Sequence, residues 1–373
     1  MILVAQLAAT SVLDSAVRAG VREGVYPGAA LVIGRRDSLL FARGYGHQTW
    51  SAQSPIVSPD STLFDLASLT KVIATTTAIM VLVDEGRIAL DTPVVRYLPR
   101  FRGGRKSEVR VRDLLAHTSG LPSYRPFFQM TKSRDSMLAL VYAEPLRTAP
   151  GSRMEYSDLN AILLGELIAW AADEPFEAFV ARRVFAPLGM RDARFRPSRA
   201  VWPRTAPTGQ WRGHAVRGEV HDQNAARLGG AAGHAGLFDT ALDLARFARF
   251  VLAGGEPLVG AATLDTFLVR QPGAGNRALG WETVPTLEET SSAGRWLSEG
   301  SVGHTGFTGT SIWIDRERDL FVILLTNRVF GPRVRNSFTS LKRVRGAVAD
   351  AAAVWVDIEL CAAGVQIALR TCE

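Results

Sequence analysis

The sequence predicts an α+β fold in which an antiparallel sheet is flanked by terminal helices and carries an inserted, mostly helical lobe. Three observations favour this fold. The chain has 373 residues, more than one hydrophobic core usually holds. Runs with strand character lie near its two ends, and the stretch between them is mostly helical in pattern. We therefore expect residues 1–60 and 275–356 to form the sheet lobe, residues 61–274 the helical lobe, and residues 357–373 a tail of unknown structure.

The N-terminal segment supplies a helix and a hairpin. Residues 8–24 have a helical pattern that the breaker Tyr26-Pro27-Gly28 ends. Residues 29–35 and 39–45 are apolar, strand-like runs, and the polar residues 36–38 form a turn between them. These two strands start the predicted sheet.

A long apolar helix is predicted from Ser68 to about Val83. Its apolar residues recur every three or four positions, and Gly86 fits a C-terminal cap. Further helices are predicted over residues 111–116, 158–171, 175–184 and 241–252. Later strands are predicted over residues 279–284, 310–315 and 320–326, followed by a last helix from Asn336 or Ser337 to about Trp355.

Charge and composition exclude several classes of protein. The net charge is +7, but the arginines are scattered and form no basic tract with interleaved aromatics, so we expect no nucleic-acid partner. No run reaches the roughly 18 uncharged apolar residues of a membrane span. The two cysteines, Cys361 and Cys372, can form a tail disulfide or remain two free thiols, and neither has a local base that would make it catalytic.

Ser68 and Lys71 open the apolar helix. Residues three apart share one face of a helix, so these two side chains should lie together. A buried ammonium is costly unless it is paired or neutralised, which favours a chemical role over a lysine that reaches solvent. The chain has only four lysines among 43 basic residues (Lys71, Lys106, Lys132 and Lys342), and lysine can lose its proton where arginine cannot.

Two later segments are further candidates. Tyr156-Ser157-Asp158 follows a Pro-Gly turn and precedes a helix, and a tyrosine can act as a general base where cations lower its pKa. Gly303-His304-Thr305-Gly306-Phe307 precedes a strand, and its glycines would let a substrate approach the backbone closely. Taken alone, the tyrosine can equally be a core residue and the glycine-rich segment a plain hairpin entry.

Together the three segments resemble the serine beta-lactamase and penicillin-binding superfamily, in its class C-like branch. That branch includes D,D-carboxypeptidases, D-aminopeptidases and family VIII carboxylesterases, and has S-x-x-K, Y-x-N and K/H-[TS]-G motifs in this order. The segments 113–124, 185–195 and 220–247 resemble the same branch, and the resemblance spans about residues 12–350. It implies a bacterial protein that is periplasmic or secreted more readily than cytoplasmic, although the apolar start "MILVAQLAAT" lacks a basic region and can also be the lead-in to a helix.

The resemblance also implies catalytic roles. Ser68 would be the acylating nucleophile, Lys71 would take or relay its proton, and Tyr156 would share the base role. His304 and Thr305 would contact a substrate carboxylate or adjust the tyrosine pKa. The backbone N–H groups of Ser68 and Phe307, beside Gly306, would form the oxyanion hole.

Two departures from the family motifs bear on the substrate. Asp158 replaces the asparagine of Y-x-N, and an ionised carboxylate cannot donate to a substrate carbonyl. His304 replaces the commoner lysine and is mostly neutral at pH 7, which weakens recognition of a carboxylate. We therefore expect small carboxylic esters or D-amino-acid amides as substrates, with D-Ala-D-Ala peptides second and beta-lactams third.

Other interpretations are weaker. His117 is expected to hold a loop. His221, Asp222 and His234 match no metal motif, and "GAGNRA" at 273–278 is not preceded by a strand as a dinucleotide-binding loop would be, so no metal or cofactor is expected. The absence of G-x-S-x-G argues against an alpha/beta-hydrolase. The alternative from another class is a non-catalytic binder of penicillin or cell-wall peptide. The oligomeric state is left open.

Overall fold

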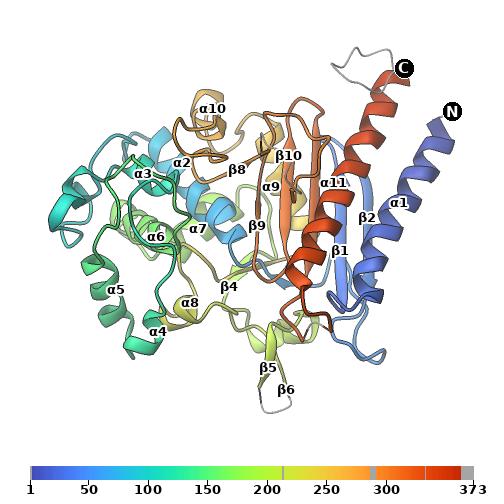
Figure 1. The fold of residues 1–373 in the computed structure, drawn as a ribbon, viewed down its shortest axis with the longest axis horizontal. Coiled ribbons are helices and arrows are strands. Elements are labelled where there is room, and N and C mark those ends of the chain that lie inside the picture. The colour runs from blue at the N-terminus through green and yellow to red at the C-terminus, as the bar shows by residue number, and fades with distance from the viewer. Residues whose placement is uncertain (1, 212–213, 286–290, 332, 363–373) are drawn as a thin grey trace.

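The computed structural model describes residues 2–211, 214–285, 291–331 and 333–362. At its centre is a six-stranded antiparallel sheet with the strand order β2-β1-β11-β10-β9-β8 (Figure 1). Its strands are β1 (Gly28–Gly34), β2 (Leu39–Gly46), β8 (Glu282–Thr283), β9 (Val302–Thr305), β10 (Ser311–Asp315) and β11 (Leu320–Thr326). The first hairpin and the last strands of the chain therefore form one sheet, and the predicted fold class is confirmed.

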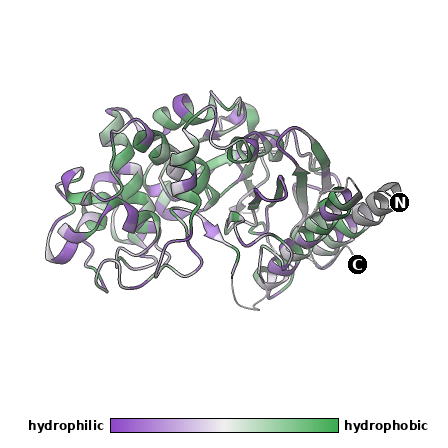
Figure 2. Ribbon diagram, turned by 90° about the horizontal axis from the view of Figure 1, so that it is seen from above, coloured by the Kyte–Doolittle hydropathy of each residue, from purple (hydrophilic) through white to green (hydrophobic). Residues whose placement is uncertain are grey.

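The two middle strands of this sheet are buried on both faces. Every residue of β1 and β11 is buried, and the side chains alternate between two separate cores. Leu31 and Val322 belong to one core, whereas Val32 and Ile323 belong to the other. This explains why both strands are continuous apolar runs in the sequence rather than alternating ones. In Figure 2, where hydrophobic residues are green, strands of the sheet are coloured as hydrophobic.

Helices cover both faces of the sheet. α1 (Ile2–Arg22) and α11 (Ser337–Ala362) pack against each other on one face, and α9 (Ala241–Leu252) packs on β1, β10 and β11 from the other (Figure 1). Cys361, near the end of α11, is disulfide-bonded, and Cys372 lies outside the described residues. Within those residues, every helix is too short or too polar to cross a membrane.

The rest of the chain forms the helical part of the molecule beside α9. It contains a π-helical segment η1 (Lys71–Thr76) that continues directly into α2 (Thr77–Asp84). Its other helices are α3 (Val111–Leu115), α4 (Phe127–Met130), α5 (Arg134–Ala143), α6 (Asp158–Ala172), α7 (Phe176–Val180), α8 (Gln223–Arg227) and α10 (Ala261–Leu268). The domain boundaries at 60/61 and 274/275 stay predictions.

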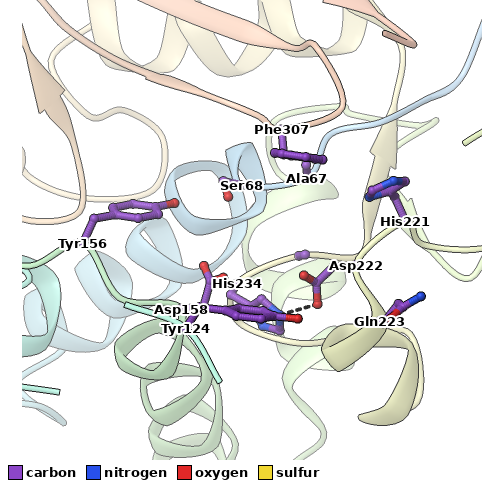
Figure 3. A pocket seen from close by; sticks show the side chains of 11 residues that line it. Ala67, Ser68, Tyr124, Tyr156, Asp158, His221, Asp222, Gln223, His234 and Phe307 are labelled. Carbon is purple, nitrogen blue, oxygen red and sulfur yellow. Dashed lines mark hydrogen bonds and ion pairs between the residues drawn. The ribbon is translucent and has the colours of Figure 1, made fainter. Parts of the chain in front are cut away.

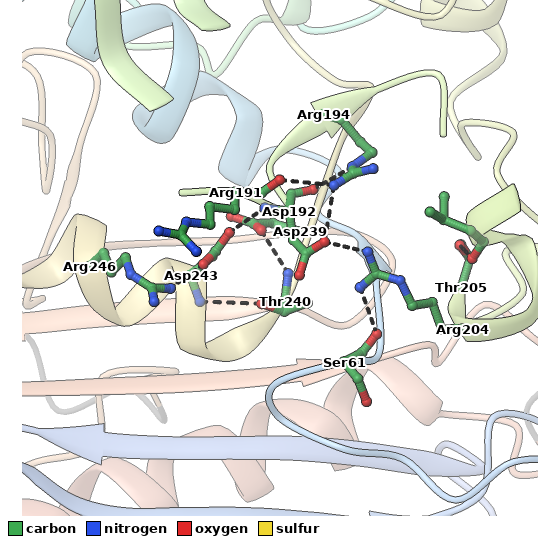
Figure 4. A network of polar contacts seen from close by, with 11 residues as sticks. Ser61, Arg191, Asp192, Arg194, Arg204, Thr205, Asp239, Thr240, Asp243 and Arg246 are labelled. Carbon is green, nitrogen blue, oxygen red and sulfur yellow. Dashed lines mark hydrogen bonds and ion pairs between the residues drawn. The ribbon is translucent and has the colours of Figure 1, made fainter. Parts of the chain in front are cut away.

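A small three-stranded sheet anchors the segment that precedes Ser68. β3 (Phe64–Asp65) pairs with β7 (Leu237–Asp239), which pairs with β4 (Arg194–Phe195). A network of arginine–carboxylate pairs surrounds these strands (Figure 4): Asp192 pairs with Arg194 and Arg204, and Arg204 also donates to the Ser61 carbonyl. Asp192 is therefore the shared acceptor that ties the β4 end of the sheet to the chain leading into β3.

Most predicted elements are present with shifted ends. β11 and α9 have the predicted bounds, α1 begins earlier than predicted, and α11 continues past Trp355 to Ala362. The predicted helix over 175–184 is α7 followed by a π-helical segment at Ala181–Phe185. The expected strand over 279–284 is only the two-residue β8. Conversely, residues 302–305, expected to be a glycine-rich entry to a hairpin, form strand β9.

Candidate active site

Ser68 is partly exposed and lies in an otherwise buried turn at the start of the buried helix. The preceding residue, Ala67, has a left-handed backbone with φ = 47°, a conformation that costs energy for a residue other than glycine. The buried Asp65 stabilises this turn, because its Oδ1 accepts a hydrogen bond from the Ala67 N–H at 2.8 Å. The helix that follows starts with the π-helical η1, a feature that is frequent at functional sites.

Lys71 lies under Ser68 and is only 3% exposed. Its Nζ is 2.9 Å from Ser68 Oγ, 2.8 Å from Asp158 Oδ1 and 3.2 Å from the His234 carbonyl oxygen. An ammonium has three N–H donors, and these three acceptors match them. The environment is therefore built for the charged form of Lys71.

The pKa of Lys71 reflects the same arrangement. Burial alone would lower it, but the negative charge of Asp158 outweighs burial, so the pKa of Lys71 is raised above its usual value. Tyr156 acts on the pKa of Lys71 in the same direction, although its hydroxyl makes no hydrogen bond to Lys71. Asp158, which stands where the Y-x-N motif has asparagine, thus keeps Lys71 protonated at neutral pH.

Tyr156 lies between two cations. Its ring centroid is 4.9 Å from Lys71 Nζ and 4.9 Å from the guanidinium carbon of Arg277. Its hydroxyl oxygen is buried and has no hydrogen-bond partner within the described part of the chain. Tyr156 is therefore placed beside two positive charges with a buried hydroxyl that is free to interact with a bound molecule.

Two neutral histidines flank the same ring. The ring centroids of His117 and His304 lie 4.6 and 5.8 Å from that of Tyr156. Burial, followed by the charges of Arg277 and Lys71, holds the pKa of each histidine well below its usual range. His117 Nδ1 accepts from the Ser157 N–H, so this histidine also secures the loop before α6, as the sequence suggests.

His304 is oriented by hydrogen bonds on both ring nitrogens. Its Nδ1 is 2.9 Å from the Thr305 carbonyl oxygen and therefore donates, which leaves Nε2 as the acceptor for Arg277 Nη1 at 3.5 Å. His304 is 2% exposed and is not among the residues that line the cavity beside Ser68. Its place favours an influence on Tyr156 over direct contact with a substrate carboxylate.

The turn between β9 and β10 brings Phe307 next to Ser68. Thr308 and Thr310 donate side-chain hydrogen bonds to the carbonyls of Asp65 and Leu66, at 2.7 and 2.9 Å. At Gly306, a Cβ atom would lie 2.1 Å from Thr310 Oγ1 and 2.5 Å from the Leu66 oxygen, so only glycine fits this approach.

The same turn leaves two backbone donors available. In the described chain, no hydrogen bond uses the N–H groups of Ser68 or Phe307. On the far side of the turn, Arg345 from α11 donates to the carbonyls of Gly306 and Thr310, at 3.0 and 2.7 Å. Free N–H groups at the nucleophile and on a facing strand are the features of an oxyanion hole.

These residues surround a cavity of about 480 Å³ (Figure 3). Its lining residues are Ala67, Ser68, Tyr124, Tyr156, Asp158, His221, Asp222, Gln223, His234, Ala235 and Phe307. The structure thus brings Ser68, Tyr156, Asp158 and Phe307 to one cavity with Lys71 beneath it. Thr305, in β9, pairs with Ser311 at the edge of this arrangement.

Three site features were not predicted from the sequence. Arg277 lies within "GAGNRA", and nothing local in the sequence indicates that it lies over Tyr156. Asp65 precedes Ser68 by three residues, and only the turn geometry reveals its role. Asp222 and His234 were weighed as metal ligands but pair with each other, Nε2 to Oδ1 at 2.8 Å. Among the described residues, no three His, Cys, Asp or Glu side chains are grouped as a metal site would need.

Comparisons with known proteins agree with this geometry. A family described as "Beta-lactamase" matches residues 13–343. Curated relatives from Salmonella agona and Salmonella typhimurium, both named "Putative D-alanyl-D-alanine carboxypeptidase", are 28% identical over 369 residues, with 89% of this chain and 85% of each relative covered.

Solved structures share the fold at lower identity. The hydrolase EstCE1, described as having promiscuous acyltransferase activity, has a TM-score of 0.75 at 20% identity, covering 93% of this chain and 100% of its own. A class C beta lactamase has a TM-score of 0.74 at 18% identity, covering 93% and 98%. An octameric penicillin-binding protein homologue from Pyrococcus abyssi has a TM-score of 0.68 at 22% identity, covering 89% and 76%.

Proposed function

Because the chain belongs to the beta-lactamase family, we propose that it is a serine hydrolase that forms an acyl-enzyme on Ser68. The observation that carries the proposal is the contact between Lys71 Nζ and Ser68 Oγ, 2.9 Å apart at the wall of the cavity. The two free N–H groups of the oxyanion hole and the two cations around Tyr156 support the same reaction.

The acylation step follows from the charges. Lys71 is held as an ammonium by Asp158, so we assign the phenolate form of Tyr156 as the acceptor of the Ser68 proton. Ser68 Oγ attacks the carbonyl carbon, and the N–H groups of Ser68 and Phe307 stabilise the resulting oxyanion by about 3 kcal/mol each, as donors in other oxyanion holes do. The intermediate collapses as the proton passes from Tyr156 to the leaving oxygen or nitrogen.

Deacylation repeats the same steps with water. Tyr156 accepts a proton from a water molecule that attacks the acyl carbon, and then returns a proton to Ser68 Oγ as the acid is released. The reaction consumes one water molecule and uses no metal or redox partner.

For the substrate, we propose small carboxylic esters or D-amino-acid amides and peptides. The support is Asp158, which accepts from Lys71 and as a carboxylate cannot donate to an amide carbonyl in the substrate. D-Ala-D-Ala carboxypeptidase activity is the second candidate, favoured by the names of the Salmonella relatives. Beta-lactamase activity is the third. A periplasmic or secreted location stays part of this proposal.

Covalent labelling tests the nucleophile. A fluorophosphonate probe should add to Ser68, identified by mass spectrometry of the digested protein, and the Ser68→Ala variant should show neither the adduct nor turnover. An adduct on another residue, or full activity of Ser68→Ala, contradicts the proposal. A panel of p-nitrophenyl esters, a D-Ala-D-Ala peptide and nitrocefin then ranks the substrate classes.

The rival function, a binder that does not turn over, makes a different prediction in the same assay. It would show stoichiometric binding or acylation without steady-state product release. The serine, lysine and tyrosine set beside an available oxyanion hole favours turnover, because a binder needs no proton acceptor for deacylation.

A further inference from the structure

The charged side chains that line the cavity are both carboxylates. Asp158 and Asp222 line it, and among the described lysines and arginines none does, because Lys71 lies beneath the surface. His221 also lines the cavity, but burial lowers its pKa, so it adds no positive charge at neutral pH. A substrate carboxylate entering this cavity would meet the carboxylates of Asp158 and Asp222, which are paired with Lys71 and His234.

Asp222 is fixed in place by the start of α8. Its Oδ1 accepts the N–H of Ala225 at 2.7 Å and lies 2.8 Å from Nε2 of His234. Figure 3 shows its other oxygen pointing into the space below Ser68. Burial would raise the pKa of Asp222, but His234 and the Ala225 N–H outweigh burial and hold it below its usual range. The carboxylate is therefore rigid and ionised.

The surrounding groups suit a cation. Two exposed aromatic side chains line the cavity, Tyr124 at 44% and Phe307 at 58% exposure, and an aromatic face attracts an ammonium group. His234 also lines the cavity, is 1% exposed, and has no hydrogen-bond partner at Nδ1 within the described residues. This part of the wall thus offers a ring nitrogen of His234 without a hydrogen-bond partner, close to the carboxylate of Asp222.

We propose that Asp222, with the aromatic walls of Tyr124 and Phe307, binds an ammonium group of the substrate. The inference rests on the proposed acyl-enzyme function and narrows it: preferred substrates carry a positive charge close to the scissile carbonyl, and substrates with a free carboxylate at that place are disfavoured. A D-amino-acid amide with a free amino group meets this requirement. A peptide that an enzyme recognises by its terminal carboxylate does not.

Binding without turnover gives the first test. On the Ser68→Ala variant, isothermal titration calorimetry should show benzylammonium binding at least about tenfold more tightly than benzyl alcohol. Asp222→Asn, which can still cap α8, should remove this difference, and Asp222→Glu should restore part of it. Asp135→Asn removes one charge from an exposed position and should leave the difference intact. Equal affinities in the Ser68→Ala protein, or a difference that survives Asp222→Asn, would overturn the proposal.

Turnover gives the second test. D-alanine p-nitroanilide and isobutyryl p-nitroanilide differ only in an ammonium replacing a methyl group, so the ratio of their kcat/KM values isolates the charge. The ratio should exceed about ten in the native protein and fall at least about fivefold in Asp222→Asn. A preference for succinyl p-nitroanilide, which carries a carboxylate, would overturn the proposal. If Ser68 forms no adduct and no substrate turns over, the hydrolase function fails, and the calorimetry still decides whether the cavity binds cations.

Discussion

Asp158 Oδ1 lies 2.8 Å from Lys71 Nζ, so the residue that departs from the family's tyrosine motif is an ion-pair partner of the lysine. The pair is mostly buried, with side-chain exposures of 20% and 4%. This contact ties the identity of one residue at the start of α6 to the protonation state of another beneath the nucleophile.

Replacing Asp158 by asparagine should shift the pH dependence of activity. Removing the carboxylate lowers the pKa of Lys71, because a nearby negative charge no longer stabilises its ammonium form. The rise of kcat/KM with pH should therefore move to lower pH by about one unit or more. Nitrocefin turnover relative to p-nitrophenyl acetate should increase, because asparagine can donate to an amide carbonyl. Asp135→Asn serves as the charge-matched control, and an unshifted profile would contradict the argument.

Lys71→Arg should reduce kcat/KM by at least about a thousandfold, or about 4 kcal/mol of transition-state stabilisation. The guanidinium keeps the charge, but it is larger and planar, and it cannot match the three acceptors around a compact ammonium. The check is steady-state kinetics alongside circular dichroism and thermal unfolding. Native turnover by a folded variant would remove Lys71 from the reaction.

Arg277→Gln should make deacylation slower at neutral pH. Losing the guanidinium removes one of the two cations beside the Tyr156 ring, so a negative charge that develops on its oxygen during the reaction is less stabilised, and the activity profile should move to higher pH. Arg277→Lys keeps the charge and should restore the profile in part. Pre-steady-state bursts with a p-nitrophenyl ester separate the two steps. A variant that alters only KM would show that Arg277 has no influence on Tyr156.

Gly306→Ala should impair both stability and acylation. The added methyl group would overlap Thr310 Oγ1 and the Leu66 oxygen, so the turn that holds Phe307 must shift, at a cost of about 1–3 kcal/mol. Gly209→Ala is the matched control, because a Cβ at that position has no neighbour within 4 Å. Chemical unfolding and the rate of fluorophosphonate labelling measure the two effects. Equal behaviour of the two variants would exclude a role for the turn.

Asp65 should make stability depend on pH. Burial raises its pKa to about 6 in the folded protein, against 3.8 for the free side chain. The folded state therefore binds the proton more tightly, so this contribution to the free energy of unfolding is complete below about pH 4 and is lost as pH rises through about 6. Asp65→Asn should reduce the change in the free energy of unfolding between pH 4 and pH 7 by about 2–3 kcal/mol relative to the native protein. Urea unfolding of both proteins across this pH range measures the difference. The same pH dependence of the free energy of unfolding in both proteins would contradict the prediction.

The parts of the fold that the sequence predicts well are those with a clear apolar pattern and visible ends. β11 is a seven-residue apolar run buried on both faces, and α9 has a capping Thr240 and a regular apolar stripe, so both ends of each element are visible in the sequence. β9 is not predicted from the sequence because it is only four residues long and contains Gly303, which lowers its strand propensity. Its pairing with β10 and the packing of Trp313 against Gly303 create the strand, and neither is a local property.

In the candidate site, residues whose contacts are local in the sequence could be predicted, and residues that only the fold brings together could not. Ser68 and Lys71 are recognisable because their contact is local, three residues apart on one helix. Arg277 is not, since only the fold places it over Tyr156 and beside His304. The catalytic roles of all these residues remain predictions that the variants above test.

The pairing of β1 with β11 has a consequence for the order in which the chain folds. Ala29 pairs with Thr326, and Gly34 with Phe321, so one of the two partners of the first buried strand lies near the other end of the chain. During synthesis β1 can pair only with β2, while the whole helical part emerges and can pack before the sheet closes. Closing so long a loop is entropically costly and slow. We expect a collapsed species with an unfinished sheet during refolding, and a ribosome-bound chain that stops before residue 320 should be sensitive to proteolysis around β1.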